Sequence, residues 1–176
     1  MTSRLLVDKL EGKTTSGTIQ MPNGTPVQIV NMNGQGESSS NTTSSSFVEI
    51  DTDFRTTITP KFSDSKIMIF CTMGLRLYKQ SGNDARCTYR LYDVTGGAAV
   101  AGTQAQVRHY DYNGGGHYGA FPIPFNVLID SWGTTAKTFT FQLQLDAGTG
   151  TATNDDTQST SITIMEIAQY WQVNFM

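Results

Sequence analysis

Charged residues are scarce in this chain, and neither sign is concentrated in any segment. They make up 15% of the 176 residues, against roughly 25% in typical soluble proteins, and the formal net charge is −3. No segment gathers lysine and arginine, which argues against the basic surface of a nucleic-acid-binding protein. The longest apolar runs, such as residues 67–71, are far shorter than the ~20 residues of a membrane-spanning helix. We therefore expect no nucleic-acid partner and no membrane partner.

Residues that commonly carry out chemistry are also few. The chain has two cysteines and two histidines, and it contains no Gly-x-Ser-x-Gly motif. Cys71 and Cys87 both fall in strand-like segments. We expect two buried, reduced thiols, with a disulfide left open should their strands be neighbours. The sequence thus favours a protein that is not an enzyme and that needs no cofactor.

Two groups of potential metal ligands are present, and neither matches an established pattern. His109, Asp111 and His117 surround a glycine-rich stretch, with a spacing that is not typical of zinc ligands. Asp155 and Asp156 lie in a glycine- and threonine-rich loop where carbonyl oxygens could complete a calcium site, but loop carboxylates are usually solvated. We therefore expect no metal site.

Strand signals dominate from residue 47 onward. Threonine, which favours half-buried strands, and glycine, which permits tight turns, are both abundant. In residues 138–146, four apolar side chains from Phe139 to Leu145 alternate with polar ones. The expected strands are residues 47–50, 55–59, 66–78, 85–94, 98–101, 104–112, 118–130, 138–146 and 159–168. Pro122 and Pro124 favour an edge position or an irregular entry for their strand. Short strands at this spacing, without a helical pattern, predict an all-β, jelly-roll-like β-sandwich.

An extended N-terminal arm is expected to precede the sandwich. The apolar pieces of residues 1–31 are too short to form a core alone, so we expect them to be buried against a second copy or a larger assembly. The residues expected to mediate particle attachment and oligomerisation are Leu5, Leu6, Val7, Leu10, Ile19, Met21, Val27 and Ile29. Residues 32–46 are predicted to be a flexible linker, and residues 47–176 the sandwich domain. Charged residues interrupt the start of the chain, so we expect no classical export signal.

Two aromatic segments are candidate contact surfaces. Flat amphipathic rings near a glycine-rich stretch are suited to stacking on sugars or to packing on a protein, although they could also cover their own hairpin. These candidate glycan- or partner-contacting residues are Tyr110, Tyr112, His117 and Tyr118. Tyr170, Trp171 and Phe175 near the C-terminus are expected to fold back on the core or to dock on a partner. In the strand before them, the apolar alternation stops at Glu166, which indicates a bulge or a carboxylate that faces an interface.

Three phrases of the sequence resemble small structural proteins of tailed bacteriophages, especially those that infect marine bacteria such as cyanobacteria. Residues 3–30, SRLLVDKLEGKTTSGTIQMPNGTPVQIV, resemble the N-terminal stretch that precedes a β-rich domain in this group. Residues 54–74, FRTTITPKFSDSKIMIFCTMG, and residues 159–169, STSITIMEIAQ, resemble a strand–turn–strand and the last strand of the same group. The resemblance implies a trimer of jelly-roll-like domains whose N-terminal segment attaches to the virion.

The leading hypothesis is therefore a non-enzymatic virion structural protein of a tailed bacteriophage. It would be a short, trimeric, fibre- or adhesin-like module, assembled in the host cytoplasm. Its arm would attach it to other virion proteins (capsid, tail or adaptor), and its loops would face the host surface and its glycans. One alternative is a capsid decoration (cement) protein, which is favoured because a chain this short has no room for a fibre shaft. Another is a glycan depolymerase, against which the scarcity of histidine and the lack of a catalytic motif count.

Overall fold

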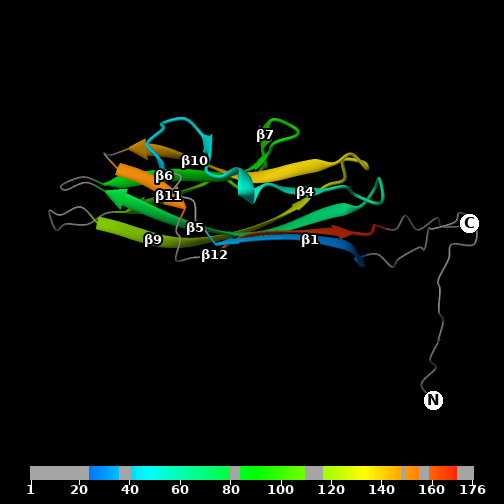
Figure 1. Ribbon diagram of the computed structural model, residues 1–176. Helices are drawn as coiled ribbons and strands as arrows, with labels where there is room; N and C mark the ends of the chain where they lie inside the picture. The colour runs from blue at the N-terminus through cyan, green and yellow to red at the C-terminus, as the bar shows by residue number, and fades with distance from the viewer. Residues whose placement is uncertain are drawn as a thin grey trace, which may run out of the picture.

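Antiparallel strands make up most of the chain that the structure describes. The structure is a computed structural model, and it describes residues 24–35, 41–79, 84–109, 117–147, 150–154 and 159–169. Within these ranges, twelve strands form two sheets, and the only helical segment is a single 3-10 turn at Thr52–Phe54. The sheets pack face to face (Figure 1), and the all-β sandwich predicted from the sequence is confirmed.

Sheet A contains six strands. Its strands are β1 (Pro26–Gln35), β2 (Asn41–Thr42), β5 (Lys66–Lys79), β9 (His117–Ile129), β11 (Gly150–Asn154) and β12 (Ser159–Ile167). β1 pairs with β12, β12 with the first half of β5, and β9 with the whole of β5. β11 pairs with the second half of β5, so β11 and β12 occupy different halves of the same side of β5, and β2 pairs with β11. Among the described strands β9 pairs with β5 alone, so the edge position predicted from Pro122 and Pro124 is confirmed.

Sheet B also contains six strands. They are β3 (Val48–Glu49), β4 (Thr56–Ile58), β6 (Ala85–Asp93), β7 (Ala98–Ala99), β8 (Ala105–His109) and β10 (Lys137–Ala147). β10 pairs with β6 on one side and with β3 and β4 on the other. β7 and β8 pair with the remaining side of β6.

Strands that are distant in sequence pair in a nested order. β1 pairs with β12, β3 and β4 with β10, β5 with β9, and β6 with β8. Nested antiparallel pairs that are divided between two sheets are the pattern of a jelly roll, in which a long hairpin ribbon wraps around one core. The chain therefore has the predicted jelly-roll topology.

The core lies between the two sheets and is built from alternate strand residues. The alternation predicted in β10 is confirmed, because Phe139, Phe141 and Leu143 are fully buried. The Phe141 ring lies edge-on to Phe54 at 6.4 Å and to Phe125 of sheet A at 5.8 Å between centroids. Burying each such side chain contributes about 1.5–3 kcal/mol, so this aromatic cluster is a main link between the sheets.

The N-terminal boundary of the sandwich differs from the predicted one. Residues 26–35, expected to span the end of the arm and the start of the linker, form β1 and pair with β12 along their length. Val30 and Met32 pack against the core, and their backbone is satisfied by the last strand of the chain. Of the expected arm residues, Val27 and Ile29 lie in this strand, whereas Leu5, Leu6, Val7, Leu10, Ile19 and Met21 lie outside the described residues.

The described part of the expected linker also belongs to the sandwich. Thr42 is buried in β2, which pairs with β11. The carbonyl of Ser44 accepts a hydrogen bond from the backbone N–H of Leu145 at 2.7 Å. The prediction of a flexible linker over these residues is therefore wrong, because polar residues that look like a linker gain backbone partners on neighbouring strands.

The two cysteines are buried and free, as predicted. Burial raises the pKa of the Cys71 thiol well above its ordinary value. Burial, and then the nearby charge of Asp146, raise the pKa of Cys87 to about 12. Both thiols are therefore protonated and poorly reactive at neutral pH.

The two ends of the described chain meet at one end of the sandwich, which we call the terminal end. The backbone N–H of Gly24 donates to the carbonyl of Ala168 at 3.0 Å, and the N–H of Ala168 donates to the carbonyl of Thr25 at 3.0 Å. β5 begins and β9 ends here as well, because Ile67 pairs with Ile129. Figure 1 shows β1 starting and β12 finishing at this same end.

The opposite end, which we call the loop end, gathers several strand ends. β5 ends there, and its Lys79 pairs with the first residues of β9 and β11. β10 also ends there, because Ala147 is close in sequence to Gly150 and pairs with Arg86 near the start of β6. The ends of β5, β8 and β10 and the starts of β6, β9 and β11 therefore all lie at the loop end.

Glu166 is a buried carboxylate close to the terminal end. Its oxygens accept hydrogen bonds from the backbone N–H groups of Lys61 (2.8 and 3.0 Å) and Phe62 (3.0 Å) and from the Gln28 amide (2.7 Å). The expectation that this carboxylate faces an interface is wrong. β12 keeps its alternation through Glu166, and the register irregularity lies in β1, between Pro26 and Gln28.

Candidate interaction surface

Three rows of uncharged side chains cross the outer face of sheet A. Antiparallel register aligns residues of neighbouring strands side by side, so each row runs from β1 through β12 and β5 to β9. Row 1 contains Ile29, Met165, Met68 and Leu128. Row 2 contains Asn31, Thr163, Phe70 and Asn126, and row 3 contains Asn33, Ser161, Thr72 and Pro124. Row 1 is apolar throughout and lies nearest the terminal end.

The large apolar and aromatic side chains that stay exposed in the described residues all lie on this outer face. Ile29, Leu128 and Phe70 keep 58%, 49% and 44% of their surface exposed. Tyr118, closer to the loop end of β9, keeps 63% exposed. Monomeric proteins rarely present a contiguous apolar patch with polar surroundings unless it contacts another molecule.

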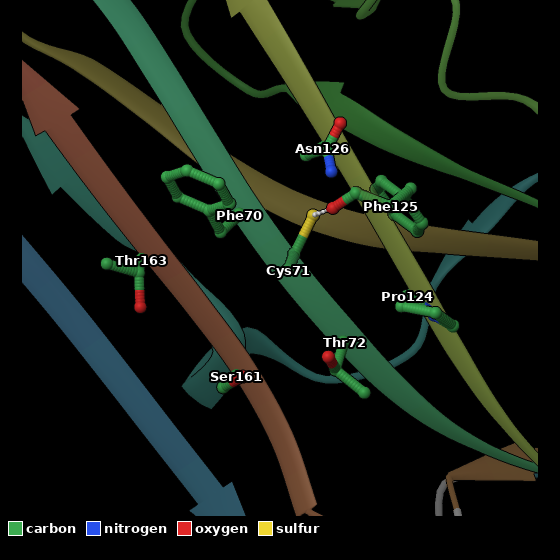
Figure 2. A pocket seen from close by; sticks show the side chains of 8 residues that line it. All are labelled: Phe70, Cys71, Thr72, Pro124, Phe125, Asn126, Ser161 and Thr163. Atoms are coloured by element: carbon green, nitrogen blue, oxygen red, sulfur yellow. Dashed lines mark hydrogen bonds between the residues drawn. The ribbon is translucent and has the colours of Figure 1, made fainter.

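A shallow hollow of about 330 Å³ lies within rows 2 and 3. Figure 2 shows Phe70 of β5 beside Thr163 of β12, with Pro124 and Asn126 on the adjacent β9. The backbone under the hollow belongs to paired strands, because β5 pairs with β12 on one side and with β9 on the other, and the Cys71 thiol donates to the carbonyl of Phe125 at 3.4 Å. The hollow therefore has a floor of paired strands, walls that carry hydroxyl, amide and apolar groups, and no charged lining residue.

An aromatic cluster lies on the same face towards the loop end. The rings of Tyr78 and Tyr118 are 4.7 Å apart, and the Arg76 guanidinium lies 5.4 Å from the Tyr118 ring centroid. Sequence reasoning identified Tyr118 but missed Tyr78, because the partner of a strand residue depends on register. The period-two pattern of residues 66–78 does place Tyr78 opposite the buried residues, which is the signal that could have found it.

The other expected contact residues are only partly covered by the structure. His117 pairs with Lys79 through its backbone at the start of β9. The remaining ones, Tyr110, Tyr112, Tyr170, Trp171 and Phe175, lie outside the described residues. The structure therefore brings Tyr118 together with Tyr78 and Arg76, and it leaves the grouping of the others as a prediction.

The outer face of sheet B is different in character, because charged and amide side chains are tied to one another across it. Arg90 donates twice to the Gln142 amide oxygen, at 2.9 and 2.7 Å, and lies 3.7 Å from the centroid of the Phe47 ring. Arg55 donates to both carboxylate oxygens of Glu49 at 2.8 and 2.7 Å. Burying this face would remove water from several charges, which is costly.

The Glu49–Arg55 pair should produce a small acid-dependent loss of stability. The hydrogen bonds from Arg55 hold the pKa of Glu49 below its ordinary value of 4.5. A carboxylate with a lowered native pKa stabilises the fold above its unfolded pKa, and this stabilisation disappears as the pH falls through the native pKa. In thermal unfolding from neutral pH to roughly pH 3, Glu49→Gln should therefore lose less melting temperature than the wild type. Identical pH profiles would contradict this.

The candidate metal ligands do not gather among the described residues. Within those ranges, no group of three or more His, Cys, Asp or Glu side chains is placed to hold a metal ion. His109 instead lies edge-on to Phe121 at 6.2 Å and covers Gly119, where an added Cβ would come within 2.8 Å of its Nδ1. The candidate ligands Asp111, Asp155 and Asp156 lie outside the described residues.

Comparison with known proteins identifies no family for this chain. In the part of the chain that the structure describes, no helix is long and apolar enough to cross a bilayer. No protein-family model matches the sequence, and no curated protein matches it. Among solved structures, the chain is similar to Eiger TNF from S. frugiperda, with a TM-score of 0.43 and 6% identity, over 84% of this chain and 98% of that one. A similarity of this degree carries no information about function.

Proposed function

We propose that this chain is a non-enzymatic structural subunit of a tailed-bacteriophage virion. In this proposal it is a short trimeric module, attached to the particle through the segment before β1. The observation that carries the proposal is the lengthwise division of the sandwich. Both ends of the described chain meet at the terminal end, and the loop end lies at the other extreme. A module built in this way can be held at one end and can present loops at the other.

The sequence phrases that resemble phage structural proteins support the same proposal. They include the segment that enters β1 and the strand that pairs with it, so the resemblance covers both elements of the terminal end. Trimers repeated around a particle bind by multivalency, which lets weak contacts at the loop end give strong overall attachment. A host surface glycan is the proposed contact, with Tyr118 and its neighbours Tyr78 and Arg76 as the described residues best placed for it.

A capsid decoration protein is the second candidate. It is favoured by the position of row 1, which places apolar side chains next to the terminal end. A shell-bound protein could use the same end to cover its apolar residues. The two candidates differ in the number of copies per particle and in their location on it.

The attachment segment gives the test of the proposed function. Deleting residues 1–23 should leave the sandwich folded, because β1 begins at Pro26, and should reduce the number of copies per particle severalfold. The measurement is the copy number in purified particles by quantitative mass spectrometry, with labelled antibodies giving the location. Deleting residues 1–31 is the matched comparison, and it should also lower the melting temperature by uncovering β12. Absence of the protein from particles, or an undiminished copy number for the shorter deletion, would contradict the proposal.

A further inference from the structure

We infer that the outer face of sheet A is the surface through which copies of this chain pack against one another. The inference rests on the proposed function, because it names the contact that would hold the trimeric module together. Row 1 and Phe70 form the centre of the contact, with the polar side chains of rows 2 and 3 beside them. The occupant of the face is thus a second copy of the chain.

The dimensions of the face suit a stable protein contact. The four strands β1, β12, β5 and β9 lie side by side along residues 66–72 of β5. At a strand spacing of about 4.8 Å this region presents roughly 450 Å² in projection, and the protruding side chains add to its accessible surface. Each partner in a standard interface contributes about 800 Å² of accessible surface. The apolar centre and the polar margins also follow the usual arrangement of an interface core and its surround.

The charges on the face favour a copy of the same chain over a charged partner. Lys66 lies at the terminal margin, 3.5 Å from Asp130, and Arg76 lies towards the loop end against Tyr118. The three rows between these margins hold no charged side chain, so the faces of three copies that surround a common axis can meet without bringing like charges together. The asparagine, serine and threonine side chains of rows 2 and 3 can donate and accept hydrogen bonds equally well with their own kind.

The relief of the face adds a second argument. Ile29 and Leu128 protrude at the two sides of row 1, and the uncharged hollow beside Phe70 lies one to two rows away. An aliphatic side chain that protrudes from one copy is chemically suited to fill the uncharged hollow of the next copy. Among the described residues, the outer face of sheet B is less suited to such a contact, because Arg90 is bonded there to the amide oxygen of Gln142 and Arg55 to the carboxylate of Glu49.

Light scattering of the full-length protein at several concentrations tests the inference. The wild type should have about three times the 19.2 kDa chain mass. Leu128→Asp should shift the mass to that of a single chain. The double variant Ile29→Thr/Leu128→Thr should do the same while keeping strand-favouring residues. Ala105→Asp, at an exposed position on β8, should keep the wild-type mass. Circular dichroism establishes that each variant is folded.

A thiol-protection measurement gives a readout that does not depend on disrupting the contact. Cys71 and Cys87 are buried, so a single introduced cysteine dominates the reaction with maleimide. Leu128→Cys should react at least about tenfold more slowly than Ala105→Cys in the native protein, and at the same rate in denaturant. Equal native rates would overturn the inference.

The outcomes separate this inference from the proposed function. A wild-type oligomer that persists in the folded face variants would overturn the assignment of the face and leave the virion module standing. A wild-type protein that stays monomeric at every concentration would overturn both the face and the trimer. The presence of the protein on particles is decided independently by the deletion of residues 1–23.

Discussion

Replacing Glu166 with alanine is expected to lower the free energy of unfolding by about 3 kcal/mol, because the change leaves several buried hydrogen-bond donors without an acceptor. The carboxylate accepts from two backbone N–H groups, at Lys61 and Phe62, and from the amide of Gln28. It thereby joins three segments, namely the turn after β4, strand β1 and strand β12. Chemical denaturation with urea, followed by circular dichroism, measures the loss.

The control for this prediction is the same substitution at a carboxylate that is only partly buried, because the Glu49 side chain keeps 19% of its surface exposed. Glu49→Ala removes a glutamate from the surface of sheet B and should cost much less than Glu166→Ala. Glu166→Gln keeps the side-chain length and one acceptor oxygen, so its effect should fall between the two. Equal losses at Glu166 and Glu49 would show that the buried carboxylate does not anchor the turn and β1.

Replacing Phe141 with alanine should cost about 3–5 kcal/mol, because it removes a fully buried ring from the centre of the core. The ring lies against Phe54 of the 3-10 turn and Phe125 of the opposite sheet, so the cavity would lie between the sheets. Phe70→Ala is the matched variant, since it makes the same chemical change on the exposed face of sheet A. It should change the unfolding free energy of the separated chain by less than about 1 kcal/mol.

Both phenylalanine variants are best compared in the Ile29→Thr/Leu128→Thr background, where association does not add to stability. In the otherwise wild-type protein, Phe70→Ala should have the larger direct effect on self-association, although Phe141→Ala has the larger effect on the free energy of unfolding. Phe70→Ala should weaken self-association, and Phe141→Ala should weaken it only through loss of folding. A Phe70→Ala variant that loses as much stability as Phe141→Ala in the dissociated background would mean that this side chain belongs to the core.

The two proposals describe one consistent module. Attachment at the terminal end and packing along sheet A would leave the loop end and the outer face of sheet B in water. The outer face of sheet B is the one whose charges are already paired, for example Arg55 with Glu49 at 2.7 Å. The side chains best suited to burial and those best suited to solvent therefore lie on opposite faces of the sandwich.

Local sequence pattern was enough to establish the fold class and most strands. The alternation from Phe139 to Leu145 identified both β10 and its buried face, because a strand residue's side is decided by its immediate neighbours. Pro122 and Pro124 likewise identified an edge strand, because a residue without an N–H group cannot support pairing on both sides. The buried state of Cys71 and Cys87 followed from the same strand pattern.

Only the tertiary structure decided which residues meet across strands. Residues 26–35 were expected in an arm and linker, yet β12 offers them a complete set of backbone partners and turns them into β1. Row 1 joins Ile29 to Leu128 through two intervening strands, so it exists only once the strand order and three registers are set. Pattern within a strand determines which way a side chain points. The neighbours that it meets are determined by long-range pairing, which local sequence does not encode.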